Sequence, residues 1–146
     1  TTLSLDDTAG IIAILRRRFP EIEGPAKDDI CYATQNRQNA VKKLAVEVEL
    51  VFVVGAQNSS NTLRLVEVAE NSGTRAIRIQ SSSELEPAFL EGCSRIGITA
   101  GASAPEDIVQ GIVEKICQWK PECRVRELKL TEEQVSFGLP LQLKSL

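Results

Sequence analysis

The sequence predicts an α/β fold in which helices cover a parallel sheet. From residue 30 onward, short aliphatic runs alternate with longer amphipathic stretches, which is the pattern of repeated βαβ units with right-handed connections. The 146-residue chain is 42% hydrophobic but has only one Trp, one Tyr and four Phe. A core must therefore consist mainly of Leu, Ile, Val and Ala, and we expect one three-layer domain, or one such domain and a fragment of another.

Hydrophobic periodicity and helix-end signals place the elements. A first helix begins at Ser4 or Asp6 and ends near Phe19, because Pro20 follows. After a connection containing Gly24-Pro25, we expect helices over about 36–46, 61–71, 83–91 and 105–119, and strands over 50–54, 75–79 and 95–99. Gly73 is placed to end a helix, and the pair Ser83 and Glu86 predicts a capping box. The tail from residue 121 is typical of short strands or an extended arm.

Composition argues against several classes of function. The net charge is -3 and no basic stripe is continuous, so we do not expect a nucleic-acid partner. No apolar run approaches the roughly 18 residues of a membrane span, and the first residues do not resemble a signal peptide. The absence of histidine excludes Ser-His-Asp and Cys-His catalysis within this chain alone. Because the chain has no methionine, we expect that it is a fragment.

The four cysteines, at positions 31, 93, 117 and 123, form no CxxC pair and fit no local zinc or ferredoxin spacing. Their pattern favours free thiols. Cys93 and Cys117 are predicted to lie in the core, and Cys123 in a loop. Cys31 ends a short apolar run just before a helix, and from the pattern alone a ligand role for it is the weaker interpretation.

Two segments repeat one design, in which a buried strand is followed by small residues, hydroxyl residues and a helix. They are LVFVVGAQNSSNTLRLVEVA and RIGITAGASAPEDIVQGIVEKI. In a parallel sheet the carboxyl ends of strands share one edge, where amide N–H groups and helix dipoles favour an anion. The candidate groups are Asn58, Ser59, Ser60, Asn61, Thr99 and Ser103. Helix capping by Ser59 or Ser60, and a capping box of Ser103 with Glu106, remain equally open. Neither loop is a nucleotide-binding motif.

Four segments together resemble the 4-hydroxy-3-methylbut-2-enyl diphosphate reductase family, also called IspH or LytB. They are TTLSLDDT, FPEIEGPAKDDICYATQNRQNAV, VVGAQNSSNTLRL and GITAGASAPEDIV, in the order of the family. The resemblance covers nearly the whole chain. It implies an iron-sulfur enzyme of the non-mevalonate isoprenoid pathway, which removes a hydroxyl group from an allylic diphosphate to give isopentenyl and dimethylallyl diphosphate.

The resemblance also implies an architecture of three pseudo-symmetric α/β domains around a 4Fe-4S cluster, with one cysteine ligand from each domain. Residues 1–27 would then be the end of the second domain and a connection, 28–120 the third domain, and 121–146 a C-terminal arm. Cys31 matches the third cluster cysteine. The other two cysteines, the diphosphate-binding histidines and the catalytic glutamate would belong to a missing N-terminal half, so we expect this chain to be inactive alone.

Individual residues take roles from the same resemblance. Thr1 matches the family threonine beside the C4 hydroxyl of the substrate, which implies orientation and proton relay. The diphosphate-binding positions are matched by Ser59, Ser60, Asn61 and Ser103. For Thr34, capping of the following helix is preferred over a contact with the cluster. The electron donor would be a ferredoxin or flavodoxin, in the bacterial cytoplasm or the plastid stroma. The alternatives are a stand-alone phosphate-binding α/β module without redox chemistry, and a structural partner of a separate N-terminal subunit.

Overall fold

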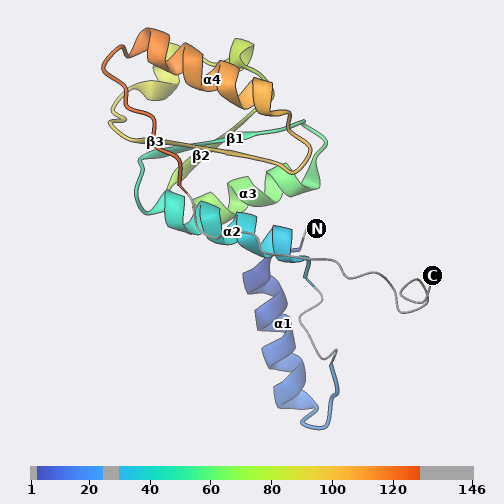
Figure 1. Cartoon of the computed structure of the whole chain (residues 1–146). Helices are drawn as coiled ribbons and strands as arrows, with labels where there is room; N and C mark the ends of the chain where they lie inside the picture. Colours follow the sequence, from blue (N-terminus) through green and yellow to red (C-terminus); the bar gives the residue numbers. More distant parts are fainter. Residues whose placement is uncertain (1–2, 25–29, 129–146) are drawn as a thin grey trace, which may run out of the picture.

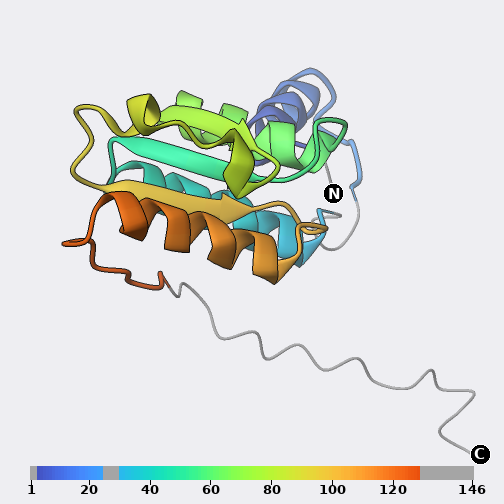
Figure 2. The same cartoon turned by 90° about the horizontal axis from the view of Figure 1, so that it is seen from above.

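The computed structural model describes residues 3–24 and 30–128, which form a three-layer α/β domain with one projecting helix (Figure 1). Its elements are α1 (Leu5–Arg18), α2 (Tyr32–Ala45), β1 (Leu50–Val54), α3 (Ser60–Asn71), β2 (Arg75–Ile79), the 3₁₀ turns η1 (Ser82–Glu84) and η2 (Pro87–Leu90), β3 (Ile96–Ala100) and α4 (Glu106–Trp119). The strands pair in parallel in the order β2-β1-β3. Helices α2 and α3 cover one face and α4 covers the other (Figures 1 and 2). The predicted fold class is confirmed.

Strand β1 lies at the centre of the core, and all five of its residues are buried. Successive side chains of a strand point to opposite faces, so β1 contributes to two apolar clusters. The cluster facing α4 includes Leu50, Phe52, Val54, Ile79 and Ile112, and the cluster facing α2 and α3 includes Val41, Val51, Val53, Leu65 and Val68. Burial on both faces explains why this strand is an unbroken aliphatic run.

Most predicted elements lie within one residue of their observed bounds, but the start of α2 does not. This helix begins at Tyr32 instead of residue 36, because the Cys31 carbonyl accepts hydrogen bonds from the amides of Thr34 (2.8 Å) and Gln35 (3.1 Å). Thr34 is therefore buried inside the first turn. The prediction that it caps the helix is wrong, because Cys31 occupies the N-cap position.

The predicted helix over 83–91 is also wrong, since two 3₁₀ turns take its place. Pro87 has no N–H group and restricts the residue before it, and Glu86 is extended with φ -118° and ψ 138°. The capping box of Ser83 and Glu86 is consequently absent. Leu85 and Leu90 are nevertheless buried in the cluster under α4, so the segment packs on the core without forming an α-helix.

Other helix-end signals are confirmed. The Ser4 hydroxyl caps α1 by accepting a hydrogen bond from the Asp7 amide at 3.2 Å. After α3, Gly73 adopts φ +86°, and its amide donates to the Glu70 carbonyl while the Thr74 amide donates to the Ala69 carbonyl. This is the Schellman arrangement, which glycine adopts without steric strain.

Cys117 and Cys123 form a disulfide, so the prediction of free thiols is wrong for this pair. The chain turns after α4, with the Cys123 amide donating to the Lys120 carbonyl at 2.8 Å, and the two Cα atoms lie 5.6 Å apart. That separation is within the usual range for a disulfide. Cys93, predicted to lie in the core, is only half-buried and packs against the margin of the cluster under α4, and both Cys93 and Cys31 are free thiols.

Helix α1 projects from the domain and has no buried residue (Figure 1). Its start is held by Gln38 of α2, a polar side chain that is only 1% exposed. The Gln38 amide nitrogen donates to the Leu3 carbonyl at 2.7 Å, and its oxygen accepts from the Leu5 amide at 3.0 Å. An exposed ion pair between Lys42 and Asp6, 2.7 Å apart, lies alongside. Gln38 is thus the main polar link between α1 and the domain.

The change Gln38→Leu tests this link. Leucine fills a similar volume but can neither donate nor accept, so the loss of about 1–2 kcal/mol should speed amide exchange at Leu5 about 5- to 30-fold. Gln118→Leu, at an exposed position of α4, is the matched control and should leave that exchange unchanged. Exchange at Leu5 can be followed by NMR, and equal rates in all three chains would contradict the link.

Thr62 of α3 fills the space between the loops that follow β1 and β3. A Cβ atom added at Gly55 would overlap the Thr62 hydroxyl and lie 2.9 Å from its methyl carbon, and one added at Gly101 would lie 2.6 Å from the same hydroxyl. Thr62 itself is fully buried. Glycine is therefore required at both strand ends to let α3 approach the sheet.

The change Gly55→Ala should destabilise the domain. Thr62 has no room to move between the two loops, so we expect a loss of about 1–3 kcal/mol in the free energy of unfolding, measured by urea denaturation. Gly10→Ala is the control, because nothing lies within 4 Å of its added Cβ atom and alanine favours the helix. A Gly55 variant as stable as the wild type would show that the close approach is not needed.

Candidate functional site

The two loops predicted to bind an anion lie side by side at the carboxyl edge of the sheet. β1 and β3 are parallel neighbours, and the Gly101 amide extends their pairing by donating to the Val54 carbonyl at 2.8 Å. Helix α3 begins directly after the first loop and α4 after the second. The arrangement thus brings two helix N-termini to one edge, which is the usual ligand-binding edge of such sheets.

In the first loop, Ser59 is the N-cap of α3. Its hydroxyl oxygen accepts from the Thr62 amide at 3.2 Å and from the Thr62 hydroxyl at 2.9 Å. The capping interpretation is therefore confirmed for Ser59. Ser60 is exposed in the first turn, while Asn61 is half-buried. The side-chain amide nitrogen of Asn61 would lie 3.7 Å from a Cβ atom added at Gly101. Asn61 thus reaches across to the second loop.

The second loop turns tightly, with the Ala104 amide donating to the Gly101 carbonyl at 3.1 Å. Ser103 lies at the exposed side of this turn. The N-cap of α4 is Pro105, which makes no side-chain cap, so the alternative interpretation of Ser103 and Glu106 as a capping box is wrong. The structure therefore gives Ser103 no role in starting α4, and its hydroxyl is placed at the same edge as Ser59.

Arg37 is a charged neighbour of these loops that sequence reasoning missed. It lies on α2, and its guanidinium donates to the carbonyl of Ala100, the last residue of β3, at 3.2 Å. The predicted anion site had no lysine or arginine in its loops. Nothing in the sequence pattern indicated that α2 would pack beside β3 and bring a cation to the second loop. Thr62 was missed as well, because it looks like one more residue of an amphipathic helix.

Cys31 is exposed and free at the start of α2. Its side chain makes no cap hydrogen bond, and its backbone lies at the positive end of the helix dipole, which attracts anionic groups. An accessible thiol in this place fits one ligand position of an iron-sulfur cluster. Within residues 3–24 and 30–128, however, no three His, Cys, Asp or Glu side chains come together as a metal site. Cys31 can supply one ligand only, and Thr1 lies outside the described residues.

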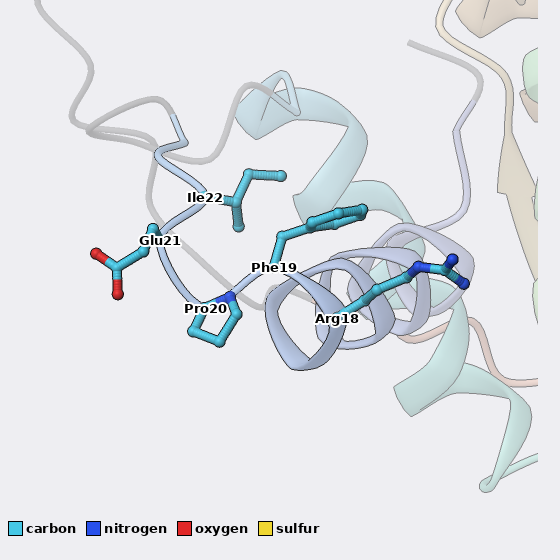
Figure 3. A pocket seen from close by; sticks show the side chains of 5 residues that line it. All are labelled: Arg18, Phe19, Pro20, Glu21 and Ile22. Atoms are coloured by element: carbon cyan, nitrogen blue, oxygen red, sulfur yellow. The ribbon is translucent and has the colours of Figure 1, made fainter.

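A hollow lies at the far end of α1 (Figure 3), away from the sheet and its loops (Figure 1). It is lined by the last residue of the helix and the four residues that follow it, Arg18, Phe19, Pro20, Glu21 and Ile22. All five are exposed, so the hollow is a surface depression without converging polar groups. Among the described helices, none combines the length and the apolar character needed to cross a lipid bilayer.

Comparison with known proteins gives consistent matches. The family model described as "LytB protein" matches residues 1–117. The chain is 49% identical over 144 residues to 4-hydroxy-3-methylbut-2-enyl diphosphate reductase of Pseudomonas aeruginosa strain LESB58, covering 99% of this chain and 46% of that protein. It is 53% identical over 143 residues to the reductase of the same name from Acidithiobacillus ferrooxidans, covering 98% and 45%.

A solved structure agrees with the sequence matches. The E-1-hydroxy-2-methyl-but-2-enyl-4-diphosphate reductase of Plasmodium falciparum superposes with a TM-score of 0.86 at 32% identity, over 99% of this chain and 46% of that one. The chain spans about half the length of the relatives that it matches. Since the family model covers most of the sequence and the fold agrees, the chain belongs to the LytB protein family.

Proposed function

We propose that the chain is the C-terminal part of a 4-hydroxy-3-methylbut-2-enyl diphosphate reductase of the non-mevalonate isoprenoid pathway. The observation that carries this proposal is the shared sheet edge, where Ser59 and Ser103 come from adjacent loops, in a chain about half identical to proteins with that name. The chain alone would be inactive, because it offers one cysteine ligand for the cluster and one wall of a substrate cavity.

The proposed diphosphate site consists of short polar side chains and backbone amides. Ser59, Ser60 and Asn61 belong to the start of α3 and Ser103 to the turn before α4, so both helix dipoles favour the anion. Arg37 adds a positive charge at the end of β3. Binding the diphosphate on two loops would fix the substrate at one end and direct its hydroxyl end toward the reacting centre.

Two further residues act at the reacting end. Cys31 would hold one iron of a 4Fe-4S cluster as a thiolate, with the other ligands supplied by the N-terminal half. When bound, such a cluster supplies the electrons that break the C–O bond of the allylic alcohol. Thr1 would orient the substrate hydroxyl and pass a proton to it. A ferredoxin or flavodoxin would be the electron donor, and the bacterial cytoplasm or the plastid stroma the compartment.

The rival proposal is a phosphate-binding module without redox chemistry. The two serine loops alone would permit it, and it requires nothing of Cys31. The two proposals therefore differ in what a cysteine change does to cluster assembly.

The deciding experiment joins this chain to the N-terminal half of the Pseudomonas aeruginosa relative by coexpression and anaerobic purification. We expect iron, acid-labile sulfide and visible cluster absorption in the complex, and their loss in the Cys31→Ser variant, because a cubane deprived of a thiolate ligand is easily lost. Cys93→Ser is the matched control, since Cys93 is the other free thiol among the described residues, and it should retain the cluster.

If this chain and the N-terminal half form a stable complex that never holds iron, the result would favour the phosphate-binding module. Equal cluster content in the Cys31 and Cys93 variants would remove Cys31 from the ligand set and leave the rest of the proposal in place.

A further inference from the structure

Thr62 is a polar residue that is 0% exposed, in the first turn of α3, three residues after Ser59. Both of its hydrogen-bond donors are directed at one atom. Its backbone N–H and its hydroxyl reach the Ser59 hydroxyl oxygen at 3.2 Å and 2.9 Å. A cap needs only the first of these bonds, so the second asks for another explanation.

The hydrogen-bonding capacity of a hydroxyl group supplies an explanation for the second bond. A serine hydroxyl has one proton to donate and two lone pairs that accept. Thr62 uses both lone pairs of Ser59, which leaves the Ser59 proton to point away from the helix. An ionised diphosphate offers acceptors only, so a hydroxyl is useful to it only as a donor.

We propose that Thr62 is a positioning residue of the anion site, which fixes the Ser59 hydroxyl as a hydrogen-bond donor toward the bound diphosphate. This inference rests on the proposed function, from which the anion site itself comes. Without Thr62, the Ser59 hydroxyl would rotate and spend part of its time with a lone pair facing the anion. Thr62 does not touch the ligand and acts through Ser59.

The packing of Thr62 strengthens this role. Its side chain lies against both Gly55 and Gly101, which leave no space for a Cβ atom. The threonine side chain is fully buried between these two strand ends, and tight packing of this kind restricts a side chain to one rotamer. The same contacts set the spacing between the loop of Ser59 and the loop of Ser103. One buried side chain thus fixes the direction of a donor and the separation of the two loops.

Three variants separate these effects. Thr62→Val keeps the volume and removes the hydroxyl, whereas Thr62→Ser keeps the hydroxyl and removes only the methyl group. Thr74→Val is the control, because the Thr74 hydroxyl is also buried and donates to the Ala45 carbonyl at 2.6 Å, at the opposite edge of the sheet. It loses a similar hydrogen bond without touching the two loops.

The measurement is an NMR titration of the whole chain with inorganic diphosphate, followed at the backbone amides of both loops. We expect Thr62→Val to raise the Kd about 5- to 30-fold, the effect of weakening a hydrogen bond to a charged group. Thr62→Ser should restore tight binding, and Thr74→Val should bind as the wild type does even though it unfolds more easily. A folded Thr62→Val chain with wild-type affinity, or a serine variant as weak as the valine variant, would overturn the proposal.

A second reading of the same samples separates this inference from the proposed function. If the wild-type chain does not bind diphosphate at millimolar concentration, the proposed anion site fails in this chain. The orientation of the Ser59 hydroxyl, which does not depend on binding, is then decided by the hydroxyl protons of the ligand-free chain. A slowly exchanging Thr62 hydroxyl proton close to Ser59 would support the orientation, and a Ser59 proton donated to Thr62 would contradict it.

Discussion

The burial of β1 on both faces is the constraint on which the other elements depend. Each of its residues pairs with β2 on one side and β3 on the other, and alternate side chains enter separate clusters. Parallel pairing forces every connecting segment to cross the sheet, so strands end and helices begin at one common edge. The proposed site is a consequence of that rule, because its loops are the first residues after β1 and β3.

Small residues at this edge make the close approach of the elements possible. Thr62 touches both Gly55 and Gly101, and Arg37 of α2 reaches the last carbonyl of β3. The polar groups at the edge are therefore placed by buried contacts of a rigid sheet and not by loop length alone. Such placement is what a site needs if it is to bind a small anion in a fixed orientation.

The sequence predicted the features that depend on local patterns. An unbroken run such as Leu50–Val54 can hardly be other than a buried strand, and glycine at position 73 has a conformation that other residues avoid. Features that depend on the exact path of the backbone could not be predicted. The disulfide of Cys117 with Cys123 needs the local turn at Lys120, and the role of Gln38 needs α2 to pack beside the start of α1. The helix predicted around Pro87 was wrong for a different reason, since the prediction gave more weight to the helical spacing of apolar residues than to a clear helix-breaking proline. The repeated loops indicated the anion-site candidates but left Ser59 divided between a cap and a ligand, whereas the roles of Cys31 and Thr1 came from family resemblance.

The weak attachment of α1 makes this helix less stable than the sheet and the helices that cover it. A helix of 14 residues is marginal in water unless tertiary contacts support it, and α1 buries no side chain against the described part of the domain. Its aliphatic residues, including Ile11 and Ile14, remain largely exposed. Local unfolding of α1 should therefore require far less free energy than opening of the sheet. Helix α1 would then act as a separate cooperative unit, which opens and closes while the sheet stays folded.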